Sequence, residues 1–92
     1  MARQRVQMFY SGRVQGVGFR YTVKSLVAGY EVVGTVRNLS DGRVELVAEG
    51  ERDELEAFLT AITESGLRRF IRGTEIWWGE PLGKLSGFEI VA

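Results

Sequence analysis

The residues that could do chemistry in this sequence gather in a glycine-rich stretch, Ser11–Arg20 (SGRVQGVGFR). Gly12, Gly16 and Gly18 punctuate it, between an alternating, strand-like segment and a segment with helical spacing of apolar residues. The first N–H groups of a helix have no partner within the helix, and the helix dipole adds partial positive charge there. The stretch therefore predicts an anion-binding loop at the start of a helix.

Arg20 is the unusual residue of this loop. It falls in the first turn of the expected helix, where Asp or Glu is normally favoured, and no acid follows before Glu31. A cation at the positive end of a helix dipole costs up to about 1 kcal/mol. Arg20 is therefore either an exposed arginine that turns into solvent or a ligand for a bound anion, and the loop alone does not distinguish the two.

Asn38, the only Asn of the chain, is the second candidate. It ends an expected strand, Val32–Asn38, and precedes an Asp-Gly turn, Leu39–Gly42, which predicts a β-hairpin. A turn residue is the simpler interpretation. Alternatively, the first strand–helix loop and the end of the second strand meet at one rim of a sheet. Backbone N–H groups, a guanidinium and the Asn38 amide would then surround a phosphate.

The elements that must position these residues follow from hydrophobic periodicity and turn residues. We expect strands at Arg5–Tyr10, Val32–Asn38, Arg43–Glu49 and Arg69–Trp78, a short strand at Phe88–Val91, and helices at Phe19–Ala28 and between Gly50 and Gly66. This order, β-α-β-β-α-β plus a short C-terminal strand, predicts an α+β fold, a ferredoxin-like α/β sandwich, with two helices on one face of an antiparallel sheet.

We expect a single domain over residues 1–92, with the second face of the sheet open to water. The residues expected on that open face are Phe9, Thr35, Arg37, Glu45, Val47 and Trp77. Gly73 is expected to mark a bulge or bend in the fourth strand.

The composition excludes several kinds of chemistry. The 92 residues include no Cys and no His, which removes disulfides, thiolate metal sites, cysteine nucleophiles and the commonest general base. Lys plus Arg and Asp plus Glu are 12 each, and this balance argues against a general binder of nucleic acids or membrane surfaces. The positive charges concentrate before Leu46, in the half with the glycine loop, which favours a small anion.

Known phosphate motifs and membrane segments do not fit this chain. The loop lacks the Gly-Lys-Ser/Thr of a nucleotide-binding P-loop, and Tyr21 stands where a dinucleotide motif has its third glycine. No apolar run approaches the roughly 18 residues of a membrane span, and the first residues lack a secretory h-region. We therefore expect a cytoplasmic protein.

Two stretches, Gly12–Arg20 and Gly34–Glu45, closely resemble the two signature stretches of the acylphosphatase family. The resemblance continues through Phe58–Leu59 and the ending Ser86–Ile90, so it covers nearly the whole chain. It implies a hydrolase that cleaves the carboxyl–phosphate bond of small acyl phosphates to a carboxylate and inorganic phosphate. It also implies an α/β sandwich and no metal or other cofactor.

The resemblance also implies roles for individual residues. Arg20 would bind the phosphoryl group and Asn38 would position the attacking water. The implied phosphate-binding residues are Gln15, Gly16, Val17, Gly18, Phe19 and Arg20, with the backbone from Gln15 to Phe19 cradling the phosphate oxygens. A carboxylate is a good leaving group, so positioning and charge stabilisation suffice and no histidine is needed.

Two departures from the family and two other interpretations remain. Ser65–Phe70 lacks a proline that many relatives carry, so we expect a local loop difference. Trp77 beside Trp78 is unusual. We expect a monomer in which Trp77 is a solvent-exposed strand aromatic, and the alternative is a dimer or partner patch formed by Trp77 with Phe9. The chain could instead be a non-catalytic ferredoxin-like module that binds an anion or RNA, or an accessory domain like those of larger carbamoyl-transfer enzymes.

Overall fold

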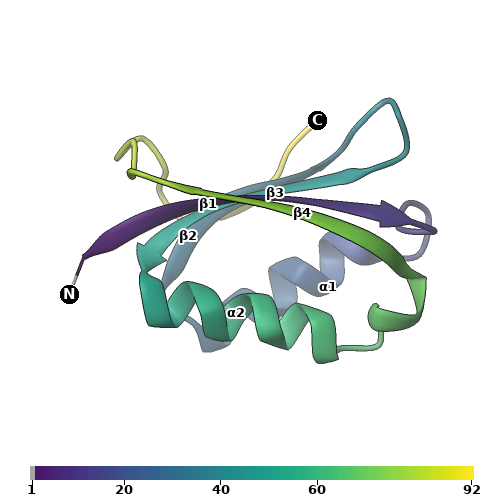
Figure 1. Cartoon of the computed structure of the whole chain (residues 1–92), viewed down its shortest axis with the longest axis horizontal. Coiled ribbons are helices and arrows are strands. Elements are labelled where there is room, and N and C mark those ends of the chain that lie inside the picture. The colour runs from purple at the N-terminus through teal and green to yellow at the C-terminus, as the bar shows by residue number, and fades with distance from the viewer. Residues whose placement is uncertain (1) are drawn as a thin grey trace.

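Alternating residues of the strands bury their apolar side chains on one side of a twisted sheet, and both helices cover that side (Figure 1). The structure is a computed structural model that describes residues 2–92. Its elements are β1 (Arg3–Gly12), α1 (Phe19–Leu26), a 3₁₀ turn (Val27–Gly29), β2 (Val32–Asn38), β3 (Val44–Glu51), α2 (Arg52–Glu64), a 3₁₀ turn (Arg68–Phe70), β4 (Ile71–Gly79) and β5 (Phe88–Ile90).

The five strands lie in the order β4-β1-β3-β2-β5. Neighbours among β1 to β4 are antiparallel, which confirms the ferredoxin-like α+β fold. The short β5 runs parallel to β2, with Gly34 opposite Phe88 and Val36 opposite Ile90, so the complete sheet is mixed. The sequence indicated a short final strand but carried no signal for the neighbour that β5 would choose.

The core lies between the sheet and the helices. β1 contributes Val6, Met8 and Tyr10 with the expected period of two, and α2 contributes Leu55, Phe58, Leu59 and Ile62 with helical spacing. The ring centroid of Phe58 lies 5.7 Å from that of Tyr30 and 5.9 Å from that of Phe88, so Phe58 packs α2 against β5. The 3₁₀ turn Arg68–Phe70 occupies the segment where a loop difference was expected.

The opposite face of the sheet is only partly open to water, which corrects the expectation for Glu45. This residue is 9% exposed, because Gln7 donates to its carboxylate at 2.7 Å and Arg37 pairs with it at 2.6 Å. Glu49 is 2% exposed, because it accepts hydrogen bonds from the N–H groups of Leu82 (2.9 Å) and Gly83 (3.2 Å). Arg37 and Trp77 are exposed as expected, and Trp77 stands opposite Gln7.

Gly12, at the end of β1, is a point of very close backbone approach. Its φ is 122°, and a Cβ atom there would collide with the carbonyl oxygen of Phe70 and lie 2.8 Å from the backbone nitrogen of Arg72. The register of β1 against β4 also shifts here, because Ser11 pairs with Gly73 and Gly12 with Ile71. The irregularity expected at Gly73 therefore lies beside it, where β4 meets the end of β1.

We predict that Gly12→Ala destabilises the fold much more than Gly83→Ala. Gly83 also has a positive φ of 72°, but no neighbouring atom lies within 4 Å of the place that a Cβ would occupy, so its substitution costs only backbone strain. The strain alone is about 1–2 kcal/mol, and the backbone collision at Gly12 adds about 1–3 kcal/mol. Urea unfolding followed by tryptophan fluorescence measures both values, and equal losses would contradict the close approach at Gly12.

We also predict that Glu45 makes stability sensitive to acid. Burial by itself raises the pKa of Glu45, but hydrogen bonds from Arg37 and Gln7 and the charges of Arg37 and Arg5 outweigh burial and lower it. A carboxyl with a lowered folded pKa stabilises the protein above its unfolded pKa, and this contribution is lost as pH falls through the folded value. Unfolding free energy measured from about pH 5 to about pH 3 should therefore fall less steeply in Glu45→Gln than in the parent. Identical slopes would contradict the prediction.

Candidate active site

The glycine loop, residues 13–18, connects β1 to α1 and lies on the surface while two apolar side chains anchor it. Val14 is fully buried and Phe19 is 2% exposed, with its ring 5.0 Å from that of Tyr10. The N–H of Arg13 donates to the carbonyl oxygen of Phe70 at 2.9 Å. Gln15, Gly16 and Gly18 are exposed. The loop therefore presents its backbone to solvent from a fixed base.

The first turn of α1 has no acceptor from a side chain. Gly18 precedes the helix in the left-handed conformation (φ 79°, ψ 20°), makes no side-chain cap, and accepts the N–H of Thr22 at 3.0 Å. Gly16 is left-handed too, with φ 77°. No acidic residue lies in this turn. The N–H groups at the helix start are thus left for solvent or for an anion, as the sequence predicted.

Arg20 lies half-buried in this first turn. Within residues 2–92 it forms no hydrogen bond or ion pair with another side chain, and neither does Arg13 in the loop, whereas Arg5, Arg37, Arg43 and Arg52 pair with acids. The charge of Arg20 therefore adds to the positive end of the helix dipole without a paired carboxylate.

Asn38 ends β2 at the same end of the sheet. It pairs with Val44 of β3, which pairs with Tyr10 of β1, so the three residues form one row across the sheet. Period-two alternation puts Asn38 on the helix-covered face, together with the buried Val36. Its Oδ1 is buried, and the described residues offer it no hydrogen-bond donor. Asn38 therefore carries an unused acceptor on the face covered by the helices.

Tyr10, in the same row, holds a second buried polar atom. Its hydroxyl finds no hydrogen-bond partner among residues 2–92, and burial raises the pKa of Tyr10 above its ordinary value. The phenol therefore stays neutral and adds no charge beneath the loop.

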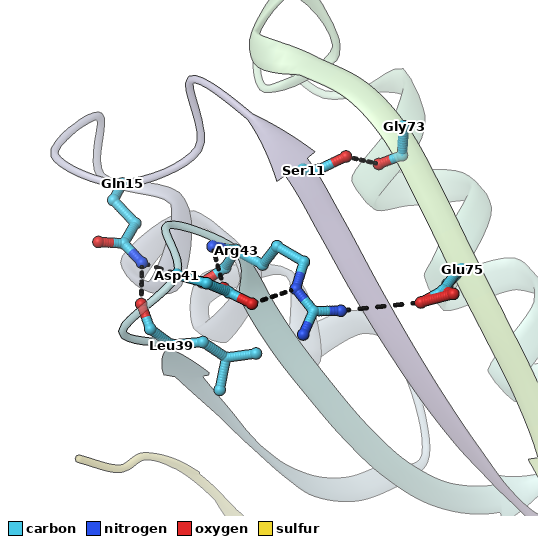
Figure 2. A network of polar contacts seen from close by, with 7 residues as sticks. All are labelled: Ser11, Gln15, Leu39, Asp41, Arg43, Gly73 and Glu75. Carbon is cyan, nitrogen blue, oxygen red and sulfur yellow. Dashed lines mark hydrogen bonds and ion pairs between the residues drawn. The ribbon is translucent and has the colours of Figure 1, made fainter.

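The glycine loop and the β2–β3 hairpin lie at the same end of the molecule, on the right of Figure 1. The side chain of Gln15 joins them, because its Nε2 donates to the carbonyl oxygens of Leu39 (2.8 Å) and Arg43 (2.9 Å), as Figure 2 shows. Sequence reasoning gave Gln15 a role through its backbone alone. The sequence pattern gave no signal for the contact between the Gln15 side chain and the hairpin, because this contact depends on the distance between two loops.

Arg43 braces the hairpin against β1 and β4 (Figure 2). Its Nε pairs with Asp41 at 2.9 Å, and its guanidinium lies 3.7 Å from the Glu75 carboxylate and 4.5 Å above the Phe9 ring. The backbone N–H of Arg43 (3.0 Å) and its guanidinium lower the pKa of Asp41 below the ordinary value. Since Arg43 covers Phe9, and acids share this face, the structure gives no support to an RNA-binding platform of Phe9 and Trp77.

A hollow of about 650 Å³ lies elsewhere, between α2 and β4, and its lining includes Met8, Leu59, Ile76 and Trp78 but no residue of the glycine loop or the hairpin. The candidate site therefore lies outside this hollow. In the part of the chain described, no three His, Cys, Asp or Glu residues group as metal ligands. No helix within residues 2–92 has the length and apolar character needed to cross a bilayer.

The structure joins Gln15 of the glycine loop to the hairpin that follows Asn38, and within residues 2–92 no hydrogen bond joins Arg20 to Asn38. Gln15 to Arg20 occupy one contiguous segment, and Asn38 lies next to the hairpin carbonyl that Gln15 contacts. The roles of these residues toward a phosphate remain predictions.

Proteins similar to this chain match it over nearly its whole length. The acylphosphatase of Roseiflexus sp. is 37% identical over 91 residues, which span 99% of this chain and 98% of that one. The crystal structure of the Bacillus subtilis acylphosphatase superposes with a TM-score of 0.88 at 32% identity, covering 97% of this chain and 99% of that one. Full-length HypF, solved in a phosphate- and nucleotide-bound form, matches with a TM-score of 0.87 and 33% identity, but over 98% of this chain and only 12% of its own. The family model for acylphosphatase matches residues 6–90, and the chain belongs to the acylphosphatase family.

Proposed function

We propose that this protein hydrolyses the carboxyl–phosphate bond of small acyl phosphates, with Arg20 and the glycine loop binding the phosphoryl group and Asn38 positioning the water. The observation that carries the proposal is the unneutralised charge of Arg20 beside an uncapped helix start. A positive group placed against a helix dipole is unfavourable by itself and becomes favourable once an anion binds between them.

Phosphate binding would use two kinds of donor. The loop from Gln15 to Phe19 offers backbone N–H groups, and the left-handed Gly16 and Gly18 set their orientation. The guanidinium of Arg20 offers a planar pair of N–H donors that matches two phosphate oxygens. Together they would hold the phosphoryl group and stabilise the charge that spreads over its oxygens in a loose transition state.

Asn38 would supply the attacking water. Its buried Oδ1 can accept a hydrogen bond from a water molecule, and its amide N–H group can donate to the substrate. The water oxygen then forms a bond to phosphorus while the bond from phosphorus to the carboxyl oxygen breaks, and the carboxylate leaves with the bonding electrons. The family resemblance assigns the water proton to a phosphoryl oxygen, so the products are the carboxylate and inorganic phosphate and no protein base is needed.

The similarity to a small part of HypF supports a second candidate function, in which a domain of this shape serves a larger assembly. The isolated chain distinguishes the two, because an enzyme releases phosphate from acetyl, carbamoyl or benzoyl phosphate by itself. We expect this release to be the same with and without a chelator.

We predict that Arg20→Lys lowers kcat/KM for benzoyl phosphate about 100-fold or more, because lysine lacks the planar fork that contacts two phosphate oxygens. Phosphate release from the purified chain measures this value. Arg3→Lys, at the far end of β1, serves as the matched control and should retain the activity of the parent. Full activity in Arg20→Lys would remove Arg20 from the mechanism.

For Asn38→Ala we predict a fall in kcat of about 100-fold, since a misplaced nucleophile costs rate while the phosphate loop is intact. Competitive inhibition by inorganic phosphate should persist with an unchanged inhibition constant. If turnover survived while phosphate no longer inhibited, Asn38 would be a phosphate ligand and the water-positioning role would be wrong.

A further inference from the structure

The side chain of Gln15 makes an unusual pair of contacts for an exposed residue. Both hydrogen bonds start from the same nitrogen, Nε2, and end on the backbone carbonyls of Leu39 and Arg43 at 2.8 and 2.9 Å (Figure 2). Because both partners are acceptors, only the NH₂ end of the amide can face them, so the orientation of the side chain is fixed. Gln15 thereby uses both amide hydrogens on a segment more than twenty residues away in the chain.

These two carbonyls belong to the turn that joins β2 to β3. Leu39 follows Asn38 directly, and the carbonyl oxygen of Arg43 also accepts the N–H of Leu39 at 2.8 Å, which closes the turn. The other hydrogen bonds of the turn stay within it, from Gly42 to Leu39 and from Arg43 to Asp41. In the part of the chain described, Gln15 therefore provides the hydrogen bonds that reach the turn from the glycine loop.

The glycine loop itself depends much less on this contact. It is anchored by the buried side chains of Val14 and Phe19, and Arg13 bonds to Phe70. The tip of the hairpin, in contrast, is exposed from Ser40 to Gly42. Arg43 still contacts Glu75 and the Phe9 ring, and Asn38 still pairs with Val44, so the hairpin stays attached to the sheet. Loss of the Gln15 contacts should therefore loosen the turn relative to the glycine loop, while the backbone of the loop and Arg20 keep their arrangement.

We propose that Gln15 is a positioning residue whose side chain clamps the β2–β3 hairpin to the glycine loop and so sets the place of Asn38 relative to the bound phosphoryl group. The inference rests on the proposed function, because it assigns a role within the same site. The clamp joins the segment that would hold phosphorus to the segment that would hold the attacking water. Attack in line with the leaving group requires the water and the phosphorus atom to be aligned, and a displacement of about 1 Å can lower the rate about 100-fold.

The test is Gln15→Met, which keeps the length of the side chain and removes both donors. We expect kcat for benzoyl phosphate to fall about 10- to 100-fold, with the inhibition constant for inorganic phosphate unchanged. Gln4→Met is the matched control, because Gln4 also makes a side-chain hydrogen bond, to Arg52 at 3.0 Å, at the opposite end of β1. It should leave both constants at the values of the parent.

A double-mutant cycle separates positioning from a general structural role. If Gln15 acts through Asn38, Gln15→Met should lower kcat little further in the Asn38→Ala background, although each change alone is severe. The clamp is overturned if the two losses multiply, if phosphate inhibition weakens along with kcat, or if Gln15→Met turns over like the parent. Failure of the function itself is recognised separately, because the parent chain would then release no phosphate.

Discussion

The proposed site depends on a positive charge at a helix start that no carboxylate among the described residues pairs with. Arg20 lies at the positive end of α1. The first turn of this helix contains no acidic residue to offset the charge, and the helix has no side-chain cap. Groups that stabilise charge act best when they are held in place before the ligand arrives. Val14 and Phe19 hold the loop by burying their side chains on either side of the exposed glycines. The hydrophobic core thus fixes the base of the exposed loop.

Much of this architecture was visible in the sequence, because it follows from local rules. The period of two in Val6, Met8 and Tyr10 and the helical spacing from Leu55 to Ile62 coincide with the sides of β1 and α2 that are buried. The absence of acids after Gly18 correctly marked the unusual helix start. These features depend on residues that are close together in the sequence, so a single sequence reveals them.

The features that escaped prediction all depend on contacts between distant segments. The parallel pairing of β5 with β2 depends on the path of the segment that connects β4 to β5. The burial of Glu45 and Glu49 depends on side chains and backbone groups that reach the far face of the sheet. The reach of Gln15 to the hairpin depends on the gap between two loops. Each requires three-dimensional distances that residue types do not encode.

The Glu49 carboxylate has a consequence for how the molecule opens. The chain leaves β4 at one edge of the sheet and must cross to β5 at the other edge, and Glu49 on β3 receives it midway through Leu82 and Gly83 (Figure 1). This crossing lies toward the start of β2, where Glu49 faces Val33, at the end of the sheet remote from Asn38. Local opening of this crossing and exchange of its amide hydrogens can therefore proceed as a separate event. Beyond the crossing, β5 runs back toward Asn38, and the N–H of Val91 donates to the carbonyl oxygen of Val36 at 3.0 Å.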